Sequence, residues 1–275
     1  MIEILILSIV QGITEFLPIS SSAHIILISK NESINIDVSL HLGSLIAVIF
    51  FFKNDIFDFL KNKLLILKIL FGSTPTLLVG FILVKLNFIE NLRNISVIAF
   101  TTIFFGIVLY YADRNNTTKK IEKDFSLKDS IYVGLFQVLS LIPGVSRSGI
   151  IITAARFLKF SRIDSAKISF LLSIPTLFFI SIYNLLELGS VININIFYNN
   201  CLATVFSFIF SIITLKFFIN FLKKFSLIFF VLFTPIAFIF RLWGRDELRL
   251  KFKKKSSYWI KRDMLAQTES FKNQF

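Results

Sequence analysis

The sequence predicts an all-α polytopic membrane protein, an inverted repeat with two re-entrant helical hairpins and about six transmembrane helices. Of its 275 residues, 55% are hydrophobic and 35 are phenylalanine, and the mean hydropathy is +0.76. Ordinary soluble domains contain about 45 to 50% apolar residues. A helix needs about 20 apolar residues to cross a bilayer, and several segments approach that length. They cover residues 38–52, 64–84, 94–112, 167–183, 199–219 and 225–240.

The inverted repeat is predicted from two halves of similar layout, residues 1–112 and 128–240. Each half begins with a polar cluster, and three apolar segments follow it. Because three is an odd number, the two halves should have opposite orientations in the membrane. Residues 113–127 form a polar linker between the halves, so that 1–240 make a single membrane domain, and a basic C-terminal tail follows at 241–275. Inverted repeats of this kind place a polar site at the repeat interface, built from broken helices.

Each polar cluster contains a helix break. Pro18 disfavours helical geometry at the preceding residue, and Pro143 is followed by glycine. We therefore expect two helix-break-helix hairpins, at residues 1–29 and 131–158. Neither arm is long enough to span comfortably, which predicts re-entrant hairpins whose irregular backbone lines a cavity.

The charge distribution indicates topology rather than nucleic-acid binding. The formal net charge is +13, but Lys and Arg lie mainly in loops and in the tail, where they orient membrane proteins and attract anionic lipid headgroups. The basic loops at 53–68 and 113–129 should be cytoplasmic, with the first hairpin on the outer side and the second on the inner side. The nine Lys or Arg residues at 241–262 do not fit this scheme, because three spans from the inside would leave the tail outside.

The first cluster carries an acid, hydroxyl groups and an imidazole. Gln11 and Glu15 are four residues apart and share one helix face. A buried Glu15 could act as a base or stay ionised beside a cation; a purely structural alternative makes it the partner of a buried arginine. Ser20, Ser21 and Ser22 offer hydroxyls and backbone N–H groups at a helix start, an arrangement that binds phosphate. His24 follows Ser21 by about one turn and could exchange a proton near that hydroxyl.

The second cluster is built around Arg147, whose planar guanidinium can hold a phosphate through two parallel hydrogen bonds. Ser146 and Ser148 flank it, and Ser146 or Val145 should begin the helix that follows. Arg147 could also pair with Glu15 across the repeat interface, which is compatible with a site there. Together the two clusters contain the groups that phosphoryl transfer needs.

These residues closely resemble the two signature motifs of the bacterial undecaprenyl-diphosphate phosphatases, the bacitracin-resistance family. The motifs lie at residues 11–24 and 143–149, and the resemblance extends over about residues 1–225, including 41–48 and 169–175. It implies an inverted-repeat fold and an enzyme of the bacterial inner membrane, with its site open to the periplasm or cell exterior. The implied reaction converts undecaprenyl diphosphate to undecaprenyl phosphate and inorganic phosphate, which recycles the lipid carrier of cell-wall synthesis.

The resemblance also implies roles for single residues. Glu15 becomes a metal ligand or base for a divalent cation, Mg²⁺ or Ca²⁺, supported by Gln11, while Ser21 becomes the nucleophile or a phosphate contact and His24 an acid or base. The phosphate-binding set is Arg147, Ser146, Ser148, Ser20 and Ser22. One departure is Ile151, which stands where the family motif has threonine.

The expected partners are undecaprenyl diphosphate and membrane lipids, with no nucleic acid and with a homodimer possible. Bacitracin would compete by binding the substrate. Two other functions are compatible with the sequence. One is a flippase or transporter for an isoprenoid phosphate, because inverted repeats with broken helices are transporter architecture; the other is a phosphatase acting on another lipid diphosphate. A pure carrier needs binding groups but no proton-transfer partner, so Ser21, His24 and Arg147 favour an enzyme.

Overall fold

A computed structural model describes residues 2–21, 24, 34–54, 56, 63–86, 94–187 and 194–227. The tail at 241–275 and Ser22 lie outside these residues. The described part is helical, and its one β-type contact is an isolated bridge between Lys119 and Phe160. In chain order the elements are α1 (Ile2–Thr14), α3 (Ile34–Phe51), α5 (Lys63–Lys85), α7 (Ile95–Asp113), α8 (Ile121–Asp124), α9 (Leu127–Val138), the 3₁₀ turn η1 (Leu139–Leu141), α10 (Arg147–Phe157), α11 (Arg162–Glu187) and α12 (Ile194–Leu222).

The protein is an all-helical, polytopic membrane protein, as the sequence predicts. Within the described residues, four helical segments are long and apolar enough to cross a membrane: Lys63–Lys85, Ser96–Asp113, Arg162–Ile182 and Phe197–Leu222. Two shorter apolar helices, Ile2–Thr14 and Val38–Phe51, accompany them. Of the six predicted spans, the last lies almost entirely beyond the described residues, so the number six stays a prediction.

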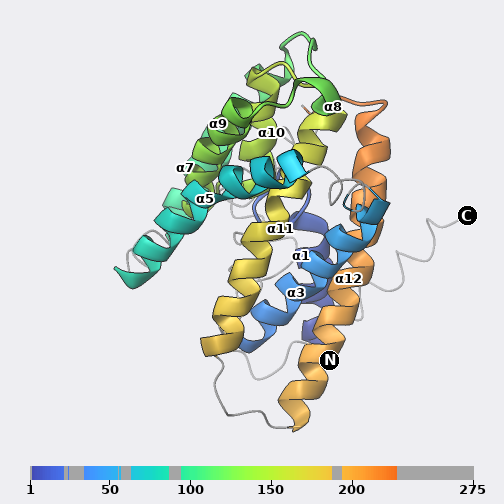
Figure 1. The fold of residues 1–275 in the computed structure, drawn as a ribbon. Coiled ribbons are helices and arrows are strands. Elements are labelled where there is room, and N and C mark those ends of the chain that lie inside the picture. Colours follow the sequence, from blue (N-terminus) through green and yellow to red (C-terminus); the bar gives the residue numbers. More distant parts are fainter. Residues whose placement is uncertain are drawn as a thin grey trace, which may run out of the picture. The chain divides into compact units, whose positions relative to one another are not determined.

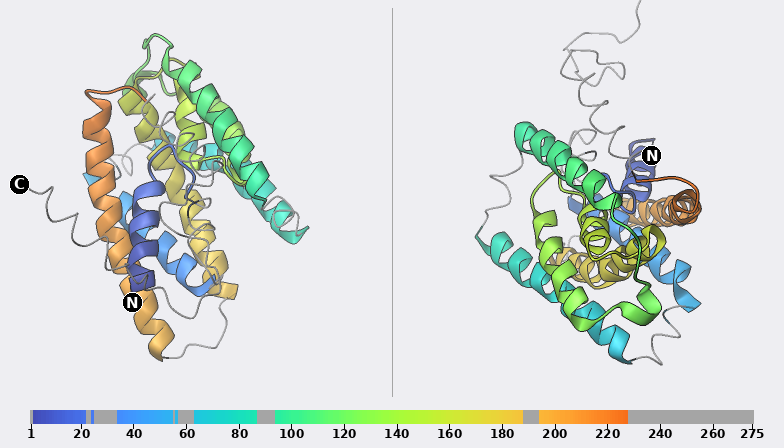
Figure 2. Two further views of the ribbon diagram at one scale, coloured as in Figure 1. Left: turned by 180° about the vertical axis from the view of Figure 1, so that it is seen from behind. Right: turned by 90° about the horizontal axis from the view of Figure 1, so that it is seen from above.

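Helix α11 lies at the centre of the described helices. It packs against α3, α5, α10 and α12, and 61% of its membrane-length window is buried, against 17% for α5. Figures 1 and 2 show α1, α3 and α12 grouped on one side of α11, with α5, α7, α9 and α10 on the other. The polar breaks after α1 and after η1 therefore approach the same central helix from two sides.

The two halves share a pattern of helix contacts. Helix α5 packs on α9 as α12 packs on α1, and α11 packs on α5 as α3 packs on α12, while α3 and α11 pack on each other. If α9, α11 and α5 are matched with α1, α3 and α12, each of these contacts has a counterpart. This pattern supports the repeat, although its boundaries and its inversion in the membrane stay predictions.

Close helix contacts depend on small residues, because dispersion and hydrogen bonds must hold helices together where lipid is as apolar as the side chains. Between α3 and α12, the Ser44 hydroxyl lies 3.2 Å from Ser207 Oγ and 3.1 Å from Ser211 Oγ, all three buried. Between α5 and α9, a Cβ atom on Gly134 would collide with the backbone of Gly72. The second hairpin is therefore fixed to α5 by backbone proximity.

We expect Gly134→Ala to destabilise the protein by about 1 to 3 kcal/mol, since a methyl group cannot enter the contact unless α9 moves away from α5. Gly80→Ala is the matched control on α5, because its Cβ would lie 3.4 Å from the Leu141 side chain, an ordinary contact. That change should be neutral or slightly stabilising through helix propensity. Thermal unfolding of both variants in detergent is the measurement, and equal midpoints for the two would contradict the close-contact explanation.

Candidate active site

The second hairpin contains the polar break that the sequence predicts. Its arms are Leu127–Val138 and Arg147–Phe157, so the hairpin begins four residues earlier than the predicted 131–158. Ser146 is the N-cap of α10, and its Oγ accepts a hydrogen bond from the backbone N–H of Gly149 at 3.2 Å. Gly144 has φ +92°, a conformation that side chains other than glycine rarely adopt. The Pro143–Gly144 turn thus lies between η1 and α10, and Ser146 begins the second arm.

Two threonines of α7 hold this turn in place. Thr101 Oγ1 donates to the carbonyl of Pro143 at 2.8 Å, and Thr102 Oγ1 donates to that of Gly144 at 3.1 Å. A Cβ atom on Gly144 would collide with the Thr101 hydroxyl. These hydrogen bonds satisfy carbonyls that have lost their helical partners, which matters most where water is scarce. Sequence reasoning missed both threonines, and their one signal was a pair of hydroxyls inside an apolar run.

The first polar break meets the second one. Helix α1 ends at Thr14, and residues 15–19 turn away from the helix axis. The ring of Phe16 is buried edge-on against Phe170 of α11, with centroids 5.5 Å apart. The backbone carbonyl of Leu17 accepts hydrogen bonds from Ser148 Oγ at 2.5 Å and from Ser146 Oγ at 3.4 Å. These two serines therefore join the motifs through backbone contact.

An ion pair between Glu15 and Arg147 lies at this junction. Arg147 Nη2 donates to Glu15 Oε1, and the two residues are 132 positions apart in the chain. The Glu15 side chain is 5% exposed and that of Arg147 16% exposed. Arg147 Nη1 donates to Thr176 Oγ1 of α11 at 2.7 Å. Burial disfavours either charge alone, so each charge stabilises the ionised form of the other.

The second oxygen of Glu15 is also occupied. Glu15 Oε2 accepts hydrogen bonds from Gln11 Nε2 at 2.9 Å and from Ser21 Oγ at 3.2 Å. The other amide atom, Gln11 Oε1, is buried and has no hydrogen-bond partner among the described residues. The pairing of Gln11 with Glu15 on one helix face agrees with the i,i+4 spacing. The carboxylate therefore accepts hydrogen bonds from an arginine, an amide and a hydroxyl.

His24 lies close to this network but is not shown bonded to Ser21. Its Nδ1 is 2.6 Å from the backbone carbonyl of Ser20. A carbonyl oxygen can only accept, so Nδ1 must carry the proton, and in the neutral ring Nε2 is then the atom that can take one. The sequence led us to expect the imidazole beside the Ser21 hydroxyl, whereas that hydroxyl donates to Glu15.

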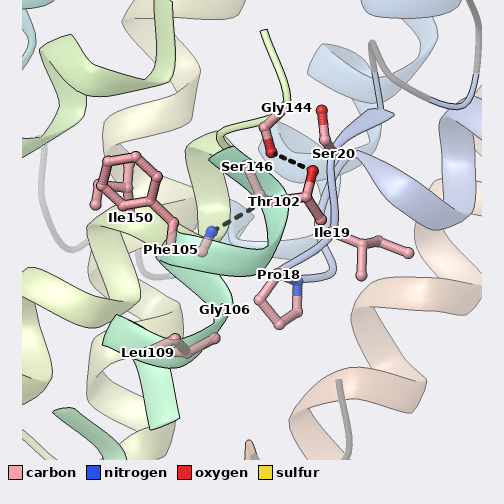
Figure 3. Close-up of a pocket in the computed structure, with 11 residues that line it drawn as sticks. Pro18, Ile19, Ser20, Thr102, Phe105, Gly106, Leu109, Gly144, Ser146 and Ile150 are labelled. Atoms are coloured by element: carbon pink, nitrogen blue, oxygen red, sulfur yellow. Dashed lines mark hydrogen bonds between the residues drawn. The ribbon is translucent and has the colours of Figure 1, made fainter. Parts of the chain in front are cut away.

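A pocket opens where the two breaks face α7 (Figure 3). Pro18 and Ser20 contribute from the first break, Gly144 and Ser146 from the second, and Thr102 from α7. Its free space is about 30 Å³, large enough for a water molecule. Figure 3 shows the Ser20 and Ser146 segments on either side of Thr102, whose hydroxyl bonds to Gly144. A water molecule can thus occupy the pocket at the junction of the two motifs.

The structure brings together most of the predicted site residues. Gln11, Glu15, Ser21 and Arg147 form one network. Ser146 and Ser148 lie beside it on the Leu17 carbonyl, Ser20 lines the pocket, and Ser22 lies outside the described residues. Ile151, which replaces the motif threonine, is fully buried in an apolar cluster. Thr153 donates to the Gly149 carbonyl of its own helix at 2.7 Å, so its hydroxyl does not replace the missing one.

Thr176 is a positioning residue for Arg147 that the sequence did not indicate. We expect Thr176→Val to lower kcat/KM for the hydrolysis that the two motifs imply by about tenfold. Valine keeps the volume of the side chain, but Arg147 Nη1 loses its hydrogen-bond acceptor. Thr176→Ser should restore most of the activity. Thr74→Val is the control, since the Thr74 hydroxyl is exposed and bonds to its own helix. Steady-state kinetics test this prediction, and an unchanged kcat/KM with Thr176→Val would contradict it.

The chain is similar in sequence to known proteins over most of its length. The model of the bacitracin resistance protein BacA family matches residues 4–239. The chain belongs to this family. An undecaprenyl-diphosphatase of Pelagibacter ubique is 46% identical over 247 residues, which cover 86% of this chain and 95% of that protein. An undecaprenyl-diphosphatase of Campylobacter curvus is 40% identical over 88% of this chain and 97% of its own length. Membership of the BacA family confirms the resemblance drawn from the two motifs.

Proposed function

We propose that this protein hydrolyses undecaprenyl diphosphate to undecaprenyl phosphate and inorganic phosphate. The observation that carries the proposal is the buried Glu15–Arg147 pair, which joins the two motifs of a BacA-family chain at one point. The relatives at 46% and 40% identity are named undecaprenyl-diphosphatase. In the reaction, oxygen attacks the terminal phosphorus, the anhydride P–O bond breaks, and the lipid phosphate leaves.

Arg147 would bind the diphosphate and stabilise the charge that develops on the transferred phosphoryl group. Phosphoryl transfer involves little covalent chemistry for a protein to perform, so positioning and electrostatic stabilisation supply most of the rate. The guanidinium lies at the N-terminus of α10, whose helix dipole also favours an anion. The hydroxyls of Ser146, Ser148 and Ser20 border the same junction and can donate to phosphate oxygens after rotation.

Glu15 is placed to accept a proton. The Ser21 hydroxyl already donates to Glu15 Oε2, so the carboxylate can act as the base for Ser21 or for a water molecule in the pocket. If Ser21 attacks, a phosphoserine forms and water then releases phosphate; if water attacks, phosphate is released in one step. The other proton transfer of the reaction involves the leaving oxygen of the lipid phosphate. His24, whose Nε2 can accept or return a proton, is the candidate for that transfer. Both routes give the same products.

The residues present fit a divalent cation such as Mg²⁺ or Ca²⁺. The described residues contain no group of three His, Cys, Asp or Glu side chains that could hold a metal alone. Mg²⁺, however, is usually bound by one or two carboxylates together with substrate phosphates. Glu15 supplies a carboxylate, and the unpartnered Gln11 Oε1 supplies a neutral oxygen beside it. When bound there, the cation would neutralise charge on the diphosphate.

The cellular setting follows from the same proposal. The protein is a multi-pass membrane protein, and we assign it to the bacterial inner membrane, with the site facing the periplasm or cell exterior, where the lipid diphosphate becomes available. Bacitracin would inhibit by sequestering the substrate. A homodimer stays a prediction from the sequence.

The test measures phosphate release by the purified full-length protein from undecaprenyl, farnesyl and phosphatidyl substrates, with and without Mg²⁺. We expect metal-dependent release that is fastest with undecaprenyl diphosphate. Lipid flipping in proteoliposomes without release of phosphate would contradict the proposal and favour the transporter. Equal rates of phosphate release from phosphatidyl substrates would show that the proposed substrate is wrong, while the proposed reaction, hydrolysis of a lipid phosphate, would stand.

A further inference from the structure

A second, larger cavity lies away from the candidate active site. It is an open cleft of about 590 Å³, formed where the linker after α7 meets the start of α11 and the end of α12. Helix α10 connects the two regions: Arg147 is at its first residue, and Arg156, which lines the cleft, is nine residues further on. At 1.5 Å per residue these positions are about 13 Å apart along the helix axis. The cleft is therefore separate from the motif junction.

The cleft is strongly cationic. Arg114, Arg156, Arg162 and Lys223 line it, and Asp113 is the one acidic residue in its lining. Asp113 is buried and neutralised, since Arg162 donates to both of its carboxylate oxygens, at 2.7 and 3.0 Å. The formal charge of the lining is thus +3. Such an excess inside a concavity attracts anions more strongly than the same charges on a flat surface would.

The four cations have different tasks. Arg156 and Arg162 are structural, because Arg156 donates to the carbonyls of Asp113 at 2.9 Å and of Asn115 at 2.6 Å, and Arg162 holds the Asp113 carboxylate. Arg114 and Lys223 are exposed and have no carboxylate partner among the described residues. Arg114 lies over the ring of Tyr110, 5.0 Å from its centroid. Lys223 Nζ donates to the exposed Asn220 Oδ1 at 3.1 Å, a neutral partner, so neither positive charge is compensated and both can attract an anion.

The position of the cleft indicates the chemistry of that ligand. Three membrane-length segments end or begin there: Ser96–Asp113 and Phe197–Leu222 end, and Arg162–Ile182 begins. The cleft therefore lies at one membrane surface, at the depth of lipid headgroups. The basic loop around it is expected on the cytoplasmic side, whose leaflet is rich in anionic lipids. Arginine beside lysine at this depth is suited to phosphate.

We propose that this cleft is a second anion site, which binds a phosphate group at the membrane surface independently of catalysis. Arg114 and Lys223 contact the phosphate, while Arg156 and Arg162 shape the floor through Asp113. The phosphate can belong to an anionic phospholipid headgroup or to free inorganic phosphate, and both sources present the same charged oxygens. Binding at the cleft needs no change in the motif junction, so this proposal can be tested separately from the hydrolase activity.

The test compares the full-length protein with Arg114→Gln/Lys223→Gln. In one arm, binding of inorganic phosphate is measured by calorimetry in a zwitterionic detergent; in the other, retention of phosphatidylglycerol is measured by native mass spectrometry after reconstitution in mixed nanodiscs. The control, Lys120→Gln/Lys128→Gln, removes the same charge from exposed positions of the same loop region that do not line the cleft. We expect phosphate binding at the motif junction to be the same in all three proteins, so that it cancels in the comparison.

We expect the cleft variant to weaken phosphate-group binding by about tenfold, as loss of two charge-assisted contacts predicts, and the control to change it less than twofold. A loss confined to phosphatidylglycerol assigns the site to lipid headgroups, and a loss in both arms assigns it to phosphate in general. Hydrolysis should stay within twofold of the parent in both variants. Equal weakening in the control and cleft variants, or no measurable effect of the cleft variant in either arm, would overturn the proposal.

Discussion

Replacement of Arg147 by alanine is expected to lower kcat/KM for undecaprenyl diphosphate by about 10³-fold or more, the scale of an arginine that stabilises phosphoryl transfer. The guanidinium lies at the start of α10, paired with Glu15 and anchored on Thr176. Its removal deletes the positive charge at the motif junction and leaves the carboxylate buried without its partner. Initial rates of phosphate release at substrate concentrations below KM are the measurement.

Arg147→Lys distinguishes charge from geometry. Lysine keeps the charge but lacks the planar fork that contacts Glu15 and Thr176 at once. We expect the lysine variant to retain more activity than alanine and still to lose about 10²-fold, because the two hydrogen bonds cannot form together. Arg114→Lys is the control, an exposed arginine outside the junction. Near-parent activity of Arg147→Lys would show that a point charge suffices and that the fork has no role.

The local features of the site could be predicted from sequence because they depend on neighbours in the chain. Pro143–Gly144 before Ser146 predicts a break and then a capped helix, and Ser146 is indeed the N-cap of α10. The four-residue spacing of Gln11 and Glu15 predicts that they share one helix face, and in the structure Gln11 Nε2 donates to Glu15 Oε2. Such features require a backbone preference or a helical period, both of which can be recognised in one segment.

Contacts across the fold could not be predicted in this way. Thr176 looks like any threonine in an apolar helix, where the hydroxyl usually bonds to the carbonyl four residues earlier. It does so here and also accepts from Arg147. The path of the first break likewise decides that Ser21 donates to Glu15. Helix propensity does not determine where a chain goes after a proline, so the one-turn spacing of Ser21 and His24 did not determine which group the Ser21 hydroxyl bonds to.

The sequence allows two hypotheses for Glu15: a structural partner of a buried arginine, or a catalytic carboxylate. The structure makes the two compatible. Glu15 pairs with Arg147 through one oxygen and accepts from Ser21 through the other, so a single side chain can hold the junction together and take a proton. Substitutions can separate the two roles, because loss of the ion pair changes the free energy of unfolding and loss of the proton acceptor changes the rate of hydrolysis.

Glu15→Gln should abolish hydrolysis and also lower the free energy of unfolding by about 3 kcal/mol, since breaking a buried ion pair leaves the charge of Arg147 uncompensated. Thermal unfolding and phosphate release must therefore be measured together. The control that separates the effects is Glu15→Gln/Arg147→Met, which removes both charges at similar volume.

Replacing a buried ion pair by neutral side chains of similar volume is often neutral or stabilising, so the double variant should unfold close to the parent and remain inactive. Recovered stability without activity would show that the Glu15–Arg147 pair acts in the chemistry and does more than stabilise the fold. A double variant as unstable as Glu15→Gln would instead mean that the Thr176 and Ser21 contacts, rather than charge compensation, stabilise the junction. Turnover close to that of the parent would exclude both residues from catalysis.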